Sequence, residues 1–244
     1  MRNRATTQRL SFGVAVTLSS VLAFVATPSR AALINRGGGL IYDTTLNVTW
    51  MQDANLAATN TFEVAGISGT GRMSWTTAQS WIAAMNGTSY KGYNDWRLPT
   101  LSPVNGTLFF NDTLTVDGSS DLGTNTVAIN QTASEMAHLF YHELGNTSSC
   151  NRQFGGLVCP GSDLANTGPF HNINLESYWS GVDHAGPAAW TFNFPTGFQG
   201  VISLDTALFA MVVRTGDVAP VPVPAALALL LPAICALGFA RRNV

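Results

Sequence analysis

Charged residues are scarce in this sequence, and basic ones are the scarcest. Only 11% of the 244 residues are charged, against about 25% in an ordinary soluble protein. Residues 32–217 hold all 14 acidic residues but only six basic ones, which gives a net charge of −8, and Lys91 is the single lysine of the chain. Such a surface repels phosphate backbones, so we expect no nucleic-acid partner.

A recognisable catalytic set is also missing. The sequence contains neither a G-x-S-x-G nor an H-E-x-x-H motif, which would indicate a serine hydrolase or a zinc peptidase. No histidine lies close to Cys150 or Cys159 in the sequence, as a cysteine nucleophile would require of a nearby base. We therefore expect a protein that is not an enzyme.

Cysteine is rare, with three residues in the whole chain. Cys150 and Cys159 flank a short loop that contains glycine, whereas Cys235 lies in an apolar C-terminal stretch. In an exported protein, two neighbouring cysteines most simply form a disulfide. A metal site with two cysteine ligands is the alternative, but no partner ligands are evident. We predict a disulfide between Cys150 and Cys159.

The N-terminus has the layout of a secretory signal peptide, which we place at residues 1–31. Three arginines lie within the first nine residues, the apolar stretch Phe12–Ala26 follows, and "PSRA" leads to a cut after Ala31. A charged start, an apolar middle and a small-residue cleavage site define such a peptide. A retained N-terminal anchor is the alternative, and the short apolar part argues against it.

The C-terminal residues 218–244 hold an apolar run that ends on two arginines. No charged residue occurs from Val221 to Ala240, and about 20 apolar residues suffice for a helix to cross a bilayer. The run has no polar face, which argues against a core helix of a soluble domain. Arg241 and Arg242 would remain cytoplasmic, so we predict a transmembrane helix at residues 221–240.

Hydrophobic periodicity predicts the first elements of the intervening part, residues 32–217, which are enough for one domain with a real core. Leu40–Tyr42 and Val48–Met51 have the pattern of a hairpin joined by polar turn residues. A helix is predicted over residues 74–87, because apolar residues from Ala78 to Met85 recur at i, i+3, i+4 and i+7.

A second helix is predicted over residues 131–146. Thr132 and Glu135 have the spacing of a capping box at its start, and Gly145 suits the position after its end. Residues 101–131 are rich in glycine, asparagine, threonine, serine and aspartate. This composition predicts that they are mostly loop.

The last part of the domain is predicted to consist of strands. Trp190, Phe192 and Phe194 alternate on one face, residues 200–203 return after a turn, and residues 208–215 are nearly all apolar, as in a central strand. With two earlier helices, this pattern indicates an α+β fold whose mixed or antiparallel sheet joins N- and C-terminal strands.

Two groups of side chains could hold a metal ion. His138 and His142 are four residues apart on a helix with Glu135 one turn earlier, a spacing that zinc can use. No third ligand is placed, so we favour an ordinary solvated helix face.

The second group, Asp112, Asp117, Asp121 and Asn125, lies in the long loop, and calcium prefers such oxygen-rich loops. The spacing is not that of an EF-hand, and the same residues make turns. We expect no cofactor, with calcium at Asp112, Asp117 and Asp121 as the open alternative.

Arg97 lies between Trp96 and Leu98, so a buried guanidinium must have a charged partner. Asp53 and Glu135 are the candidates. We expect Arg97 to tie a loop through paired hydrogen bonds rather than to contact a ligand.

The last 24 residues resemble a sorting signal. A short proline motif, an apolar stretch and terminal arginines follow one another, as in the PEP-CTERM signal in its VPxPA form, although the chain ends in "RRNV" rather than in a longer arginine run. The resemblance implies a Gram-negative bacterium and an exosortase partner that recognises and cleaves the tail. The residues concerned are Val221, Pro222, Pro224, Ala225, Arg241 and Arg242.

A second resemblance covers about residues 38–216. The segments "YNDWRLPT", "YWSG", "AWTFNFPTG" and "AMVVRTG" follow in this order, as in the Lcl C-terminal-like domain family, which is placed with C-type-lectin-like folds. This chain departs from shorter members by the insertion at residues 101–131. The resemblance assigns structural motif roles to Trp96, Arg97, Leu98, Pro99, Tyr178, Trp179, Trp190 and Arg214.

These features favour a protein exported to the cell envelope, outer surface or extracellular matrix, with membrane contact through its C-terminal helix. We expect a non-catalytic binding module, for which extracellular polysaccharide is the candidate ligand. A structural envelope protein without a ligand is the alternative. An enzyme related to the formylglycine-generating group is less favoured, because the surroundings of Cys150 and Cys159 do not reproduce the required cysteine context.

Overall fold

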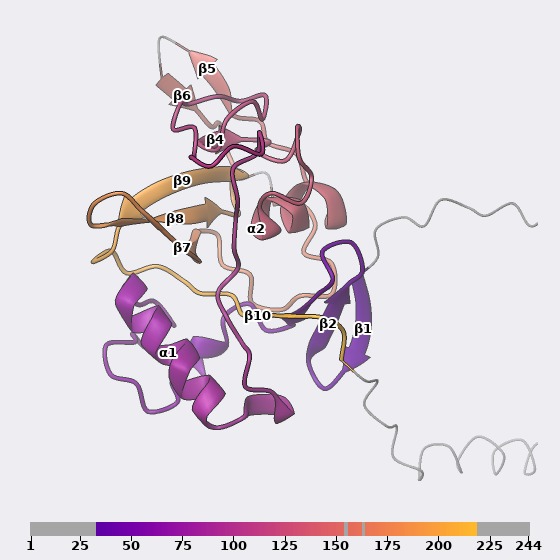
Figure 1. Cartoon of the computed structure of the whole chain (residues 1–244), viewed down its shortest axis with the longest axis vertical. Helices are drawn as coiled ribbons and strands as arrows, with labels where there is room; N and C mark the ends of the chain where they lie inside the picture. The colour runs from indigo at the N-terminus through magenta and orange to yellow at the C-terminus, as the bar shows by residue number, and fades with distance from the viewer. Residues whose placement is uncertain (1–32, 154–155, 163, 219–244) are drawn as a thin grey trace, which may run out of the picture. The chain divides into compact units, whose positions relative to one another are not determined.

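The structure, a computed structural model, describes residues 33–153, 156–162 and 164–218. The expected signal peptide and the tail from residue 219 onward lie outside these residues, so the sorting motif and the predicted helix at 221–240 do as well. Within the described part, none of the helices combines the length and the apolar character needed to cross a bilayer. What remains is a mixed α and β domain (Figure 1).

One four-stranded antiparallel sheet joins the start and the end of the domain. Its strands lie in the order β1-β2-β3-β10, with bounds β1 Leu33–Gly37, β2 Leu40–Asp43, β3 Val48–Met51 and β10 Val213–Thr215. The predicted hairpin is β2–β3, in which Ile41 lies opposite Trp50. Asp43 forms its turn, because Oδ1 accepts the backbone N–H groups of Thr45 and Leu46, each at 3.0 Å.

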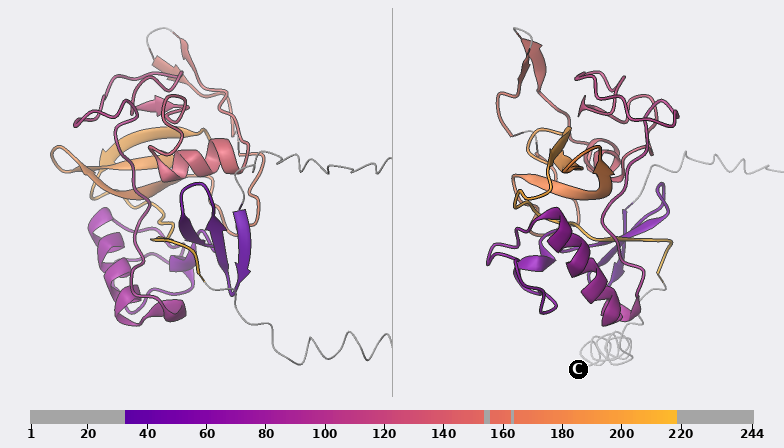
Figure 2. Two further views of the ribbon diagram at one scale, coloured as in Figure 1. Left: turned by 45° about the vertical axis from the view of Figure 1, so that its right-hand side comes forward. Right: turned by 60° about the vertical axis from the view of Figure 1, so that its left-hand side comes forward.

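The later strands form a second antiparallel sheet rather than extending the first, so the single sheet expected from the sequence is two sheets. The order is β4-β9-β8-β7, with bounds β4 Gly123–Thr124, β7 Ser177–His184, β8 Ala188–Asn193 and β9 Phe198–Ser203. A small hairpin, β5 Asn151–Gln153 with β6 Gly156–Val158, projects beyond this sheet in each view (Figures 1 and 2).

The first helix forms as predicted. α1 spans Trp75–Gly87 and buries Ala78, Trp81, Ile82 and Met85, while the side chain of Ser74 caps its start by accepting the N–H of Thr77 at 3.2 Å. Two short 3-10 turns flank it, η1 Leu56–Ala58 and η2 Tyr90–Gly92. α1 packs beside β7 (Figure 2).

The second helix is shorter than predicted and changes type halfway. α2 spans Glu135–His138 and continues directly into a π-helical turn, η3, at Leu139–Glu143. The capping box proposed for Thr132 and Glu135 is wrong. The helix begins at Glu135, so Ser134 is the cap and accepts from the N–H of Ala137. Glu135 is then the first helical residue rather than the third, as a capping box requires.

Two hydrophobic cores lie on opposite faces of the first sheet. The Trp-rich core contains Trp81, Trp96 and Trp179 together with Met51, Met73 and Met85. The Phe-rich core contains Trp50, Phe140, Phe170, Phe192, Phe194 and Phe209. Adjacent residues of β3, Trp50 and Met51, point to different cores, since successive side chains of a strand face opposite ways.

The prediction of a central strand at residues 208–215 is wrong in one respect. Only Val213–Thr215 form a strand, β10, and it lies at the edge of its sheet. Leu208, Ala210 and Val212 enter the Trp-rich core, whereas Phe209, Met211 and Val213 enter the Phe-rich core. The run is apolar throughout because it is extended and enclosed on both faces. Its backbone forms hydrogen bonds with several different segments along its length.

Candidate functional site

The W-R-L-P-T motif lies where several elements meet. Arg97 binds Glu135 through two hydrogen bonds of 2.7 Å, and the same carboxylate accepts the N–H of Thr100 at 2.7 Å. Of the two candidate partners, Glu135 is therefore the one that pairs with Arg97. Asp53 instead accepts from the backbone of Asn55 and the side chain of Asn172.

The neighbours of Arg97 are buried and bonded to backbone. Trp96 donates its indole N–H to the carbonyl of Tyr90 at 2.9 Å, Leu98 is buried, and the carbonyl of Pro99 accepts the N–H of Gly181 at 2.7 Å. Arg97 also exchanges two backbone hydrogen bonds with Val213. These contacts link η2, β7 and β10, so the role of the motif in these contacts is structural.

The other motif residues are mostly buried as well. Tyr178, Trp179 and Trp190 are fully buried, and burial raises the pKa of the Tyr178 hydroxyl to about 12. Arg214 is different. It forms two hydrogen bonds with Asp95 at 2.8 and 2.9 Å near the surface and stacks over Tyr93, 4.2 Å from the ring centre.

The loop aspartates each serve a different partner. Asp121 is fully buried and accepts the backbone N–H groups of Val104 and Asn111. Asp117 accepts from Ser119, which lowers the pKa of its carboxyl, and Asp112 lies 2.9 Å from the imidazole of His184. These bonds shape the 101–131 loop. Among the described residues, Asp112, Asp117 and Asp121 do not belong to a group of side chains that lie close enough to share one ion.

The predicted disulfide between Cys150 and Cys159 is present and joins the two ends of the β5–β6 hairpin. Cys150 is buried, and its Sγ lies 3.7 Å from the carbonyl of Thr196. The bridge closes the exposed hairpin, and Cys150 packs beside the turn before β9.

The solvated histidine face expected on the second helix is wrong for His138. Its side chain is 1% exposed; Nδ1 lies 2.7 Å from the carbonyl of Gln131 and Nε2 lies 3.2 Å from Glu143. Burial lowers the pKa of His138, but the hydrogen bonds to Glu143 and Gln131 outweigh burial and raise it. His142 is exposed and stacks on His138 with 5.3 Å between ring centres.

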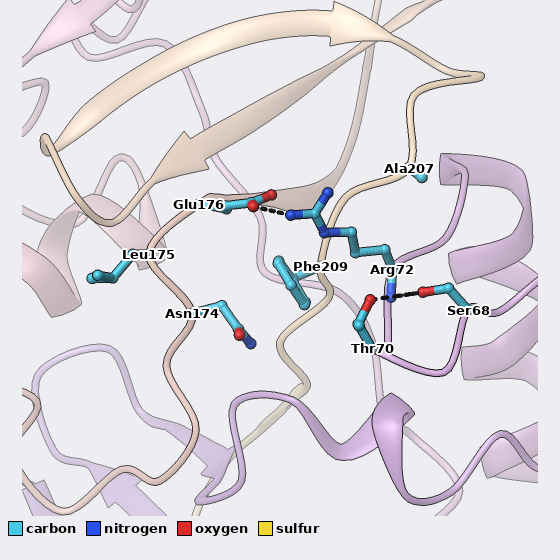
Figure 3. A pocket seen from close by; sticks show the side chains of 8 residues that line it. All are labelled: Ser68, Thr70, Arg72, Asn174, Leu175, Glu176, Ala207 and Phe209. Carbon is cyan, nitrogen blue, oxygen red and sulfur yellow. Dashed lines mark hydrogen bonds and ion pairs between the residues drawn. The ribbon is translucent and has the colours of Figure 1, made fainter.

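An open pocket of about 490 Å³ lies between the loop at Ser68 to Arg72 and the segment before β7 (Figure 3). Arg72 forms an ion pair with Glu176 across it, and its guanidinium lies 5.2 Å from the ring centre of Phe209. Both charged side chains are about 40% exposed. The pocket, hereafter the Arg72 pocket, is lined by Ser68, Thr70, Arg72, Asn174, Leu175, Glu176, Ala207 and Phe209.

The Arg72 pocket was not predicted from the sequence. Its residues come from three distant segments, and none of them belongs to a recognisable motif. Its walls offer hydroxyl, amide, carboxylate and guanidinium groups together with the exposed side chain of Leu175. Such a mixture suits a ligand that presents both hydroxyl groups and apolar faces.

The family prediction is confirmed by comparison with known proteins. The model of the Lcl C-terminal domain family matches residues 39–214, and the chain therefore belongs to that family. No curated protein and no solved structure matches the chain. Membership fits an exported or cell-envelope protein, while the relation to C-type-lectin-like folds and the sorting signal stay predictions.

Proposed function

We propose that this member of the Lcl C-terminal domain family is an exported, non-catalytic binding module that holds a polysaccharide in the Arg72 pocket. The observation that carries the proposal is the composition of that pocket. Arg72 and Glu176 place a charged donor beside a charged acceptor, and Asn174, Ser68 and Thr70 add neutral groups of both kinds. Sugar hydroxyls both donate and accept hydrogen bonds, so they match such a lining.

The pocket also suits a chain-like ligand in its shape. It is open rather than enclosed, and Leu175 is 61% exposed beside it, where it offers a surface to the C–H face of a sugar ring. The negative charge of the domain favours a neutral or cation-bearing polysaccharide over an acidic one.

Binding to the polysaccharide of the producer's own envelope tests the proposal. The purified full-length chain is run by affinity electrophoresis through gels containing that polysaccharide, with and without calcium. We expect retardation of the wild type and about tenfold weaker binding for Arg72→Gln, since a hydrogen bond to a charged group contributes about 1.5–3 kcal/mol. Asn174→Ala should weaken binding less, because a hydrogen bond of its neutral amide contributes about 0.5–1.5 kcal/mol. The calcium arm tests Asp112, Asp117 and Asp121.

Thr61→Ala is the matched control. Thr61 lines another open pocket of about 480 Å³, together with Thr59 and Glu63, so the change removes one polar group from a hollow of similar size. It should leave the retardation unchanged. Equal retardation of wild type and Arg72→Gln would remove the pocket from consideration, and no retardation at all would favour a structural envelope protein.

The sorting role is a separate part of the proposal. The order of proline motif, apolar run and arginines supports recognition of the tail by an exosortase, transient membrane anchoring and cleavage near residues 221–225. Prolines favour extended backbone in the residues before them, which proteases can enter. The intact mass of the protein from its native host measures this, and a mass that includes residues 226–244 would indicate a retained anchor.

A further inference from the structure

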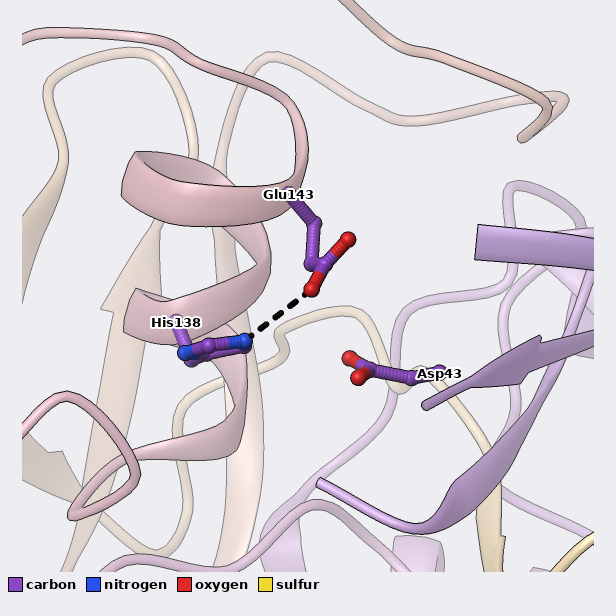
Figure 4. Close-up of side chains that lie close together, drawn as sticks. All are labelled: Asp43, His138 and Glu143. Carbon is purple, nitrogen blue, oxygen red and sulfur yellow. Dashed lines mark hydrogen bonds and ion pairs between the residues drawn. The ribbon is translucent and has the colours of Figure 1, made fainter. Parts of the chain in front are cut away.

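Three ionisable side chains converge beside the Phe-rich core. Asp43, His138 and Glu143 each direct one potential ligand atom to a common point, and these atoms lie within 4.8 Å of one another (Figure 4). Asp43 is fully buried, and the side chains of His138 and Glu143 are each 1% exposed. Neither the family match nor the Arg72 pocket involves this cluster as a functional site.

In Asp43 and His138, one polar atom of each side chain already has a backbone partner outside the cluster. Asp43 Oδ1 accepts two backbone N–H groups in the β2–β3 turn, while Oδ2 is buried and has no hydrogen-bond partner among the described residues. His138 Nδ1 faces the carbonyl of Gln131. A carbonyl can only accept, so Nδ1 carries a hydrogen and Nε2 is the ring nitrogen that faces the cluster. The proton on Nε2 forms the bond to Glu143, and the Nε2 lone pair becomes available to a metal ion when that proton leaves.

This arrangement is the one that metal-binding histidines use. Their second ring nitrogen donates to a carboxylate or backbone carbonyl, which fixes the tautomer and the orientation of the ring. Here the Nδ1 hydrogen goes to the carbonyl of Gln131, and Nε2 lies 3.2 Å from Glu143 Oε1. Two lone pairs facing each other repel unless a proton or a metal cation lies between them.

The charges of the cluster also favour a cation. Two carboxylates lie in a place that water does not reach, and isolated buried anions are strongly disfavoured. A divalent cation would neutralise both carboxylates and provide Oδ2 with the partner that it lacks.

The π-turn positions the third ligand. In an α-helix, residues five apart point about 140° away from each other, so Glu143 would not face His138. The wider turn η3, closed by the 2.9 Å bond from Leu144 N–H to the carbonyl of Leu139, brings them together. Single π-turns within helices occur frequently at functional sites.

We propose that Asp43, His138 and Glu143 form a binding site for one divalent transition-metal ion, with zinc as the first candidate. One imidazole nitrogen and two carboxylate oxygens suit zinc, whereas calcium and magnesium prefer oxygen ligands alone. Zinc binds such atoms at about 2.0–2.2 Å. Three atoms within 4.8 Å of one another lie at most about 2.8 Å from a common centre, so each moves inward by less than about an ångström. The ion cross-links the β2–β3 turn to the π-turn.

Metal content and thermal stability of the full-length chain test the site. The chain is stripped with EDTA, loaded with zinc, dialysed and analysed for bound metal. We expect about one equivalent in the wild type, and a rise in Tm of about 5–10 °C at a free zinc concentration of a hundred times Kd. Asp43→Asn and Glu143→Gln should retain less than about a tenth as much zinc.

The variants are chosen so that the fold survives. Asp43→Asn keeps the oxygen that accepts from Thr45 and Leu46, and Glu143→Gln keeps the shape of the side chain. Circular dichroism in EDTA checks that both are folded, and if one is not, the other decides. His142→Gln is the control, because His142 stacks on His138 without belonging to the cluster, and it should bind zinc as the wild type does.

Cobalt supplies a readout of the ligands themselves. Co²⁺ bound at this site should give visible absorption bands that are lost on addition of zinc and absent in Glu143→Gln. Fewer than about 0.2 equivalents of zinc in the wild type would overturn the proposal. So would zinc binding to folded Asp43→Asn or Glu143→Gln at wild-type strength, or a Tm rise with calcium but not with zinc.

Discussion

The two cores of the domain treat their buried polar groups differently. In the Trp-rich core, the indole N–H groups of Trp81, Trp96 and Trp179 each donate to a backbone carbonyl at 2.9 Å. In the Phe-rich core, the indole N–H of Trp50 is equally buried but has no partner among the described residues. The same side chain is thus fully satisfied on one face of the first sheet and not on the other.

The difference teaches where to look for binding. A buried polar group without a partner is disfavoured, so natural proteins keep few of them, often where function requires it. The Trp-rich core has the character of a scaffold. The Phe-rich core also adjoins Asp43, His138 and Glu143. Two buried polar atoms that lack a partner among the described residues, Trp50 Nε1 and Asp43 Oδ2, therefore lie in or beside the core next to the inferred metal site.

The largest effect is expected where the two cores are tied together. Arg97→Ala leaves the buried Glu135 carboxylate with Thr100 as its remaining hydrogen-bond partner among the described residues. Breaking a buried ion pair from one side costs about 3–5 kcal/mol, and we expect about 3, because Arg97 is partly exposed. Urea denaturation measures the change, and Arg97→Lys should lose less. A fully stable Arg97→Ala protein would show that this tie is dispensable.

The disulfide should have the next largest effect. Cys150 and Cys159 are nine residues apart, and closing such a short loop restricts the unfolded chain by about 2–3 kcal/mol. We expect the Cys150→Ser, Cys159→Ser double variant to lose that much stability in denaturation, and an unreduced peptide to show the bridge by mass spectrometry. Two free thiols in protein from an oxidising compartment would contradict the pairing.

A pair of tryptophan variants tests the comparison of the cores directly. Trp179→Phe and Trp50→Phe remove the same atoms from fully buried positions, but only the first removes a hydrogen bond, the one to the carbonyl of Met73, which keeps the N–H of Leu208 as a donor. We expect Trp179→Phe to cost about 0.5–1.5 kcal/mol more than Trp50→Phe. Equal losses would mean that hydrogen bonding does not distinguish the two cores.

The smallest effect is expected at the surface, outside both cores. Arg214 lowers the pKa of Asp95, mainly through their hydrogen bonds. A carboxyl whose pKa is lowered by folding stabilises the protein above its unfolded value, about 3.9, and the gain is lost as the pH falls through the folded value. Asp95→Asn should therefore cost less than about 1 kcal/mol at neutral pH and nothing in strong acid. A loss that persists in acid would point to a cause other than charge.

The sequence predicts the elements whose pattern has a single cause. α1 and the β2–β3 hairpin follow directly from regular apolar spacing. Residues 208–213 do not, because side chains that alternate between two apolar cores give the same run as a central strand. Nothing in the spacing tells whether such a run is enclosed by one sheet or lies between two cores.

The inferred metal site illustrates the same limit. Helical spacing draws attention to His138 and His142, which are four residues apart, whereas the structure pairs His138 with Glu143, five residues away. Only a π-turn makes that pair possible, and no residue of η3 indicates a π-turn in the sequence. Asp43 belongs to polar turn residues in the sequence, and one of its oxygens does serve the turn. Its other oxygen becomes a candidate metal ligand only in the folded protein, where His138 and Glu143 lie close to Asp43.

The segment at residues 208–213 also determines when the domain can fold. It contributes to both cores and bonds Met73, Arg97 and Trp179, all of them distant in sequence. Because synthesis proceeds from the N-terminus, neither core can close before this segment has left the ribosome. Formation of the native state then waits for contacts of long sequence separation, which makes it slow. Until this segment has been synthesised, both cores stay incomplete and the chain remains unfolded. An unfolded chain is the form that can pass through a narrow pore.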